Sequence, residues 1–198
     1  MKKIIIGNWK LNLDHLEAIQ LLQKLNYTIE EGKEEEIDIV VSPSHTSLRS
    51  IQTIIDTDKL NIQLSAQDVS QFSGGAYTGE VSSHQLNKLN VSYCIVGHSE
   101  RRIEFNESDE VINQKVHNLV KEGITPIICF GETLEQRNSN QYLEHITNQI
   151  NSAVKGLRKD KVENLVFAYE PIWAIGTGEV ASLVAVSYTH LTLPTTLS

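Results

Sequence analysis

The feature that most constrains the fold of this chain is a repeated alternation between two kinds of hydrophobic pattern. Six short runs are almost continuously apolar, and we predict each to be a strand buried on both faces: residues 3–7, 37–41, 60–64, 91–96, 124–130 and 165–169. The stretches between them carry apolar residues at helical spacing: Leu16, Ile19, Leu22 and Leu25, then Val111, Val116, Leu119 and Val120, then Ile146, Ile150 and Val154. This β-α-β-α order predicts a parallel sheet with right-handed crossovers.

Two α/β architectures are compatible with this pattern, an open doubly wound sheet and an incomplete barrel. A dinucleotide-binding doubly wound sheet would carry a glycine-rich phosphate fingerprint after its first strand, and the sequence has none there. The first, fourth and sixth runs instead end in polar and ionisable residues, and strand ends are where a barrel places its catalytic groups. The hydrophobic pattern alone leaves both architectures open, so the motifs have to decide between them.

Charge and hydropathy argue against two classes of partner. The formal net charge is −8, and no cluster of lysine and arginine forms a basic face, so we expect binding to neither nucleic acid nor an anionic membrane. The apolar start of the chain ends at Gly7, and we interpret it as a strand and not as a signal peptide. No apolar run approaches the roughly 18 residues of a membrane span.

Cysteine and histidine usage argues against a disulfide framework and a metal site. Cys94 and Cys129 lie apart in separate apolar segments, which indicates reduced, buried thiols in a cytoplasmic protein. The seven histidines are scattered, and no His-x3-His or Cys-x2-Cys spacing is present. We therefore expect neither a metal nor an organic cofactor.

Two of the polar strand ends have ordinary explanations when each is taken alone. The first run is followed by Asn8 and Lys10, and such a lysine is usually a solvated surface charge. The fourth run is followed by His98 and Glu100. A histidine there can be a structural residue, and the glutamate can form a plain ion pair with a neighbouring arginine.

The third polar strand end is harder to explain structurally. Glu170 stands directly before a loop, residues 171–178, that is apolar yet contains two glycines. Solvated loops are usually polar, whereas a loop that carries Ile172, Trp173 and Ile175 needs something to close over. This combination predicts a carboxylate beneath a lid.

Taken together, these strand ends resemble the triosephosphate isomerase family. The resemblance rests on Asn-x-Lys at residues 8–10, Gly-His-Ser-Glu-Arg-Arg at 97–102 and Tyr-Glu-Pro-x-Trp-Ala-Ile-Gly-Thr-Gly at 169–178. The segments at 66–70 and 75–81 resemble the family's dimer loop, and Cys-Phe-Gly-Glu at 129–132 resembles its strand-five ending. The resemblance runs from about residue 3 to about residue 182 and implies a (β/α)8 TIM barrel, of which this chain carries about six of the eight βα units.

The resemblance also implies an activity and a set of site residues. The family interconverts dihydroxyacetone phosphate and D-glyceraldehyde 3-phosphate through an enediolate, in glycolysis and gluconeogenesis, without a cofactor. By this resemblance, Glu170 accepts the proton, His98 is the electrophile and Lys10 stabilises the oxyanion. Asn8 orients the substrate, and Glu100 supports the lysine and histidine. Gly176 donates its backbone N–H to the phosphate when the lid, at about residues 171–180, closes. The resemblance further implies a homodimer through the loop Asp68–Val81, with Thr78 reaching the neighbouring subunit's site.

The sequence departs from the family pattern after the lid. We interpret residues 1–185 as a partial catalytic domain without strands seven and eight, whose loops frequently form the phosphate site, and we expect this chain alone to be inactive. Glu179 stands where many family members carry lysine. We interpret residues 186–198 as in-frame read-through of a sequencing adapter. The alternative is a divergent helix, which the threonines and Pro194 disfavour.

Two other functions compete with an isomerase of trioses. One is a non-catalytic barrel fragment that keeps only the loop Asp68–Val81 as an interaction surface. Loss of catalytic residues would favour it, but Asn8, Lys10, His98 and Glu170 are all present. The other is a different phosphosugar barrel isomerase, which predicts different chemistry after the sixth strand.

Overall fold

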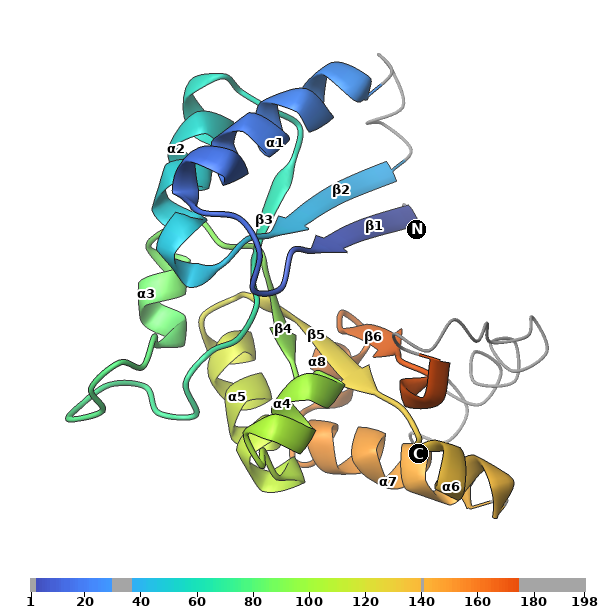
Figure 1. Ribbon diagram of the computed structural model, residues 1–198. Coiled ribbons are helices and arrows are strands. Elements are labelled where there is room, and N and C mark those ends of the chain that lie inside the picture. The colour runs from blue at the N-terminus through green and yellow to red at the C-terminus, as the bar shows by residue number, and fades with distance from the viewer. Residues whose placement is uncertain (1–2, 30–36, 140, 175–198) are drawn as a thin grey trace. The chain divides into compact units, whose positions relative to one another are not determined.

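The computed structural model describes residues 3–29, 37–139 and 141–174 (Figure 1). Gly176, Glu179, the second half of the predicted lid and the assignment of residues 186–198 fall outside these ranges. The chain divides into two compact units, one formed by Met1–Ile95 and Asn118–Pro126, the other by Val96–His117 and Ile127–Ser198. The elements β4, α5 and β5 pass from one unit into the other.

The first unit is a parallel sheet with helices between its strands. Its elements are β1 (Lys3–Asn8), α1 (His15–Thr28), β2 (Ile37–Ser42), a 3-10 turn (His45–Ser47), α2 (Leu48–Thr57), β3 (Gln63–Ala66), α3 (Ser83–Asn87) and most of β4 (Tyr93–Val96). β1 pairs with β2 from Lys3 opposite Ile37 to Asn8 opposite Ser42, so these two strands end together. Both β2–β3 and β3–β4 are also parallel.

The second unit carries the later elements of the chain. They are α4 (Ser99–Glu104), most of α5 (Asp109–Lys121), most of β5 (Thr125–Phe130), α6 (Leu134–Asn138), α7 (Tyr142–Val154), α8 (Lys159–Val162), β6 (Val166–Tyr169) and a 3-10 turn (Ile172–Ala174). β5 pairs with β6 in parallel, from Ile127 opposite Val166 to Phe130 opposite Tyr169. Phe130, Ile146 and Ile150 form a core cluster here, against which Phe167 and Tyr169 pack.

Strand order decides between the two architectures that the sequence left open. The strands are neighbours in the order of the chain, from β1 to β6. A doubly wound sheet reverses its order at a switch point, whereas a barrel adds each strand beside the one before it. The fold is therefore an incomplete (β/α)8 barrel, as predicted.

Two details of the strand prediction are wrong. The third strand is Gln63–Ala66, not residues 60–64, because the Leu60 N–H still donates to Ile55 O in the turn that ends α2. Burial on both faces fails for β1, where Ile5 is 58% exposed, and for β6, whose residues are all half-buried. These strands come first and last in the sheet order, so each has one neighbouring strand among the described residues.

The predicted helices α1, α5 and α7 are confirmed. In α1, Ala18 and Leu22 are buried, and Asp14 caps the helix by accepting hydrogen bonds from the N–H groups of Leu16 and Glu17. Leu16 is 58% exposed, so it lies at the margin of the apolar stripe that the spacing predicted. Among the helices that the structure describes, none is both long and apolar enough to cross a membrane.

Candidate active site

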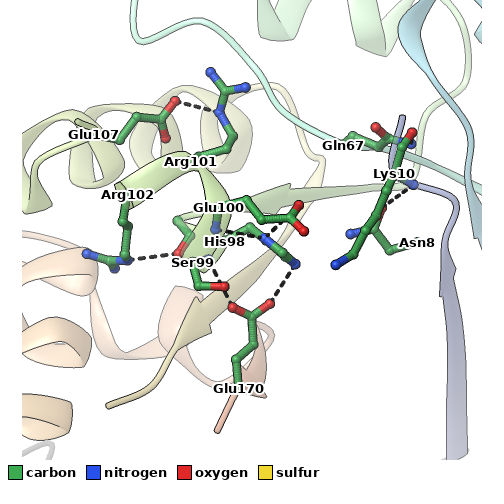
Figure 2. A network of polar contacts seen from close by, with 11 residues as sticks. Asn8, Lys10, Gln67, His98, Ser99, Glu100, Arg101, Arg102, Glu107 and Glu170 are labelled. Carbon is green, nitrogen blue, oxygen red and sulfur yellow. Dashed lines mark hydrogen bonds and ion pairs between the residues drawn. The ribbon is translucent and has the colours of Figure 1, made fainter. Parts of the chain in front are cut away.

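In the second unit, His98 and Glu170 face each other at the ends of two strands (Figure 2). After β4 the chain turns at Gly97, whose φ of +69° favours glycine, and His98 then caps α4. Glu170 is the first residue after β6. His98 Nε2 lies 3.0 Å from Glu170 Oε1, and the Ser99 N–H donates to Glu170 Oε2 at 2.9 Å. Both carboxylate oxygens are thus engaged.

The backbone of α4 selects the tautomer of the imidazole. The Glu100 N–H donates to His98 Nδ1 at 3.2 Å, so this nitrogen uses its lone pair as an acceptor. The proton of a neutral ring then resides on Nε2, which donates to Glu170. His98 is a neutral donor that is 8% exposed.

Glu100 contributes to this arrangement through its main chain. Its Oε2 lies 3.5 Å from His98 Nδ1, but an unprotonated Nδ1 has no hydrogen to give to a carboxylate. The Glu100 side chain is 51% exposed. Its backbone N–H is therefore the group that orients the imidazole.

Burial and hydrogen bonding act in opposite directions on the pKa of Glu170. Burial raises this pKa, but the hydrogen bonds from His98 and from the Ser99 N–H outweigh it and leave the pKa below its ordinary value of 4.5. At neutral pH the group is therefore an ionised carboxylate, able to accept a proton, whose side chain is only 15% exposed. A partly desolvated carboxylate beside a neutral donor is suited to general acid–base chemistry.

The end of β5 supports Glu170 from the main chain. The Glu170 N–H donates to Phe130 O at 2.8 Å. The neighbouring Cys129 is buried and free, as predicted. Its burial, and secondarily the charge of Glu170, hold the Cys129 pKa well above its ordinary value, so this thiol stays protonated and unreactive.

A fully buried carboxylate, Glu132, holds the residues on both sides of Glu170. Its Oε1 accepts hydrogen bonds from Arg137 Nη1 at 2.7 Å, from Tyr169 Oη at 2.9 Å and from Trp173 Nε1 at 3.0 Å. Burial and then the bond to Glu132 raise the pKa of Tyr169 to about 12. From the sequence, Glu132 was predicted only as part of the segment at 129–132 that resembles the family's strand-five ending. The signal that was available is an acidic residue two positions after the apolar run at 124–130.

A second polar network links Arg102 on α4 to Gly97 before the helix and to Asp109 after it. Arg102 Nε donates to Gly97 O at 2.8 Å, and its Nη1 binds Asp109 Oδ1 at 2.6 Å. The main chain on the N-terminal side of His98 is therefore held by a charged side chain that is itself fixed. This fixes the main chain from which the His98 side chain extends.

The first unit places Asn8 and Lys10 together at the end of β1. Asn8 Oδ1 accepts the Lys10 N–H at 3.0 Å, and Gln67 Nε2 donates both to Lys10 O at 2.9 Å and to Ser42 O at 2.8 Å. Lys10 has a φ of +53°, in the left-handed region, which costs a non-glycine residue about 1 kcal/mol. Gln67 is a positioning group that sequence reasoning missed, since its partners are main-chain carbonyls.

The described residues show no arrangement of three or more histidine, cysteine or acidic side chains that could hold a metal ion. The catalytic residues predicted in the second unit, His98, Glu100 and Glu170, are brought together there. Asn8 and Lys10 are brought together in the first unit. Gly176 lies beyond the residues that the structure describes.

Comparison with known proteins identifies the family. The family model described as triosephosphate isomerase matches residues 3–198. A triosephosphate isomerase of Saccharopolyspora erythraea is 51% identical over 179 residues, which cover 90% of this chain and 69% of that protein. Those of Corynebacterium efficiens and Streptomyces coelicolor are 49% and 47% identical, over 91% and 89% of this chain and 69% of each relative. The chain belongs to the triosephosphate isomerase family.

Proposed function

We propose that this chain carries the proton-transfer chemistry that interconverts dihydroxyacetone phosphate and D-glyceraldehyde 3-phosphate. The observation that carries the proposal is the pair formed by an ionised Glu170 and a neutral His98 whose Nε2 is the donor. Moving a proton between adjacent carbons through an enediolate requires a base for carbon and a donor for the oxygens. These two residues supply both.

The geometry implies a movement before chemistry. In the structure, the Glu170 carboxylate accepts hydrogen bonds from the His98 Nε2–H and from the Ser99 N–H. To remove a proton from carbon, the carboxylate leaves these donors and approaches the substrate. The same movement frees the Nε2–H to donate to a substrate oxygen, so base and electrophile are released together.

The remaining site residues have supporting roles in this proposal. Lys10 stabilises negative charge on the enediolate oxygen, Asn8 orients the substrate, and Glu100 fixes His98 through its N–H. Gly176 donates its backbone N–H to the phosphate when the lid closes, which keeps water from the intermediate. The reaction needs no cofactor.

We also propose a homodimer and a cytoplasmic location. The loop Asp68–Val81 is closed at its base by the Ser70 N–H donating to Val81 O at 2.8 Å, and the Phe72 ring stacks on Tyr77 with centroids 3.6 Å apart. Thr78 is exposed on this ordered loop, as expected of a residue that reaches a neighbouring subunit. Cys94 and Cys129 are buried and reduced, which suits a reducing compartment.

The test is incorporation of solvent deuterium into dihydroxyacetone phosphate. It is run on this chain and on a chimera in which its residues 1–182 are followed by the remaining C-terminal part of the Saccharopolyspora relative. Glu170→Gln keeps the size of the side chain but removes the base, and we expect it to slow exchange in the chimera by roughly 100- to 10,000-fold. Glu144→Gln, on the exposed face of α7, is the matched control and should leave exchange unchanged.

Exchange in the chimera that does not depend on Glu170 would overturn the proposal. A chimera without any exchange would favour the alternative, a non-catalytic fragment that keeps only its loop surface. The expectation that this chain alone is inactive stays a prediction. It is contradicted if the unmodified chain exchanges deuterium in a Glu170-dependent way.

A further inference from the structure

We propose that Gln149 is a positioning residue for the base Glu170 and acts through the main chain of Gly131. The inference rests on the proposed role of Glu170. Gln149 lies on α7 and is 6% exposed, and its Oε1 accepts the Gly131 N–H at 3.0 Å. Within the part of the chain that the structure describes, Gln149 forms no hydrogen bond with His98 or Glu170, so its influence has to pass through the backbone.

Gly131 and Glu170 are in direct backbone contact. The Glu170 N–H donates to the carbonyl of Phe130, the residue before Gly131. The Glu170 carbonyl oxygen lies where a Cβ on Gly131 would be. No flexible side chain separates the two main chains, so a displacement of Gly131 passes directly to the backbone that carries the catalytic carboxylate.

The Gly131 N–H needs an acceptor that the sheet does not supply. The β5–β6 register ends at Phe130 opposite Tyr169, one residue before Gly131. Gly131 is buried, and a buried N–H without a partner is costly. The Gln149 amide oxygen meets this need from another element of the unit.

A packing role alone does not explain an amide at this position. Gln149 lies beside Ile150 and one turn after Ile146, both of which are buried on α7. An apolar side chain would fill the same volume without the cost of burying an amide. The amide is therefore expected to serve its hydrogen bond.

The helix that carries Gln149 is itself anchored. Asn113 on α5 donates through Nδ2 to Ala153 O and to Lys155 O, both at 3.0 Å. His117 Nε2 lies 2.9 Å from the same Lys155 carbonyl. The end of α7 is thus fixed to the helix that follows the His98 segment, which gives Gln149 a firm base from which to hold Gly131.

The proposal is tested by proton NMR of the His98 Nε2–H, because this signal reports where the Glu170 carboxylate lies whether or not the protein turns over. Gln149→Met keeps the volume but removes the acceptor, and Gln149→Glu keeps an acceptor oxygen at the same reach. We expect Gln149→Met to move the signal towards that of Glu170→Gln and to speed its exchange with water by at least about tenfold. Gln149→Glu should retain the wild-type signal, and Gln141→Met, at the exposed start of α7, is the matched control.

A Gln149→Met protein that keeps the His98 signal while its Gly131 amide signal changes would overturn the proposal, because the hydrogen bond would then be structural only. If Gln149→Met does not fold, Gln149→Asn, which is one methylene shorter, is put through the same measurement. In the active chimera, we expect a loss in kcat of roughly 10- to 100-fold with little change in KM, since the base is displaced but the substrate contacts remain. Failure of the proposed function would instead appear as deuterium exchange that is independent of Glu170.

Discussion

The Glu170 carboxyl is held between two opposing effects. Burial favours its protonated form, while His98 and the Ser99 N–H favour the carboxylate and prevail. The balance depends on groups that can be removed singly. The pKa of Glu170 therefore reports directly whether its contacts with His98 and with the Ser99 N–H are intact.

Removing the imidazole should reverse this balance. We expect His98→Ala to raise the pKa of Glu170, because burial remains while the largest opposing hydrogen bond is lost. The measurement is a carbon-13 NMR titration of the Glu170 carboxyl, with His15→Ala, at the exposed start of α1, as the control. An unchanged pKa in His98→Ala would contradict the assigned contact.

The same shift has a consequence for stability. Because the pKa of Glu170 is lower in the folded protein than in the unfolded chain, the carboxylate contributes stability above its unfolded pKa. That contribution is lost as the pH falls through the folded pKa. The free energy of unfolding therefore loses this contribution at acid pH.

Tyr169 titrates at the opposite end of the pH scale. Its pKa of about 12 reflects burial first and the bond to Glu132 second, so we expect Glu132→Gln to lower it while leaving it above the ordinary value of 10.0. The phenolate absorbance at pH 11, taken as the difference from a Tyr169→Phe protein, measures this. The raised pKa contributes stability below pH 10, which is lost as the pH rises through about 12. An equal phenolate fraction in both proteins would show that Glu132 does not stabilise the phenol.

Residues whose partners are side chains at strand ends were predictable from the sequence. Glu170 stands directly after an apolar run and His98 two residues after one, and the family resemblance assigned their roles. Gln67 and Gln149 were not found, because each binds main-chain atoms far away in the sequence, and no local pattern distinguishes such an amide from a surface one. The orienting N–H groups of Ser99 and Glu100 have no sequence signature at all.

Among the elements, the junction of β5 and β6 is the tightest. Gly131→Ala would place a methyl group on the Glu170 carbonyl oxygen, so the two strand ends would have to move apart. We expect a loss of about 1–3 kcal/mol in the free energy of unfolding, measured with urea. Gly74→Ala is the control, since a Cβ there meets nothing within 4 Å, and its effect should stay within about 0.5 kcal/mol. Equal stability of the two variants would mean that the strand ends relax easily.

Prediction of elements succeeded where the pattern was long and failed at edges. The helices α1, α5 and α7 span 13 or 14 residues, and their periodicity was sufficient. β3 was misplaced because its last two residues, the polar Ser65 and the small Ala66, add little to a hydrophobic pattern, although both are fully buried. Burial of β1 and β6 was overestimated because an apolar run does not reveal whether a strand has a neighbour on one side or on both.

At the scale of the whole molecule, the hydrophobic pattern predicted a parallel α/β protein but did not distinguish an incomplete barrel from an open doubly wound sheet. Strand order is a property of the assembled sheet, and the same alternation serves both architectures. The motifs at the strand ends favoured the barrel, and the observed order from β1 to β6 confirmed it. Quaternary structure stays a prediction, because it depends on a second chain.

The proposed dimer predicts a position-specific effect on assembly. Thr78→Arg places a long charged side chain on the exposed loop Asp68–Val81, and we expect it to weaken self-association by at least about tenfold because the charge would be desolvated at the interface. Sedimentation velocity over a concentration series measures this in the chimera. Thr53→Arg, the same change at an exposed position of α2, is the control. Identical sedimentation of the two variants would place the interface elsewhere.

The left-handed backbone of Lys10 sets stability and function against each other. A glycine relieves the strain at a φ of +53°, so Lys10→Gly should unfold at a higher urea concentration than the wild type while losing the ammonium group. Random variants of this chain selected only for resistance to protease would accumulate glycine or asparagine at residue 10. Retention of lysine there under mutation would be evidence that selection has acted on turnover, and it gives a way to distinguish a gene that is in use from one that is decaying.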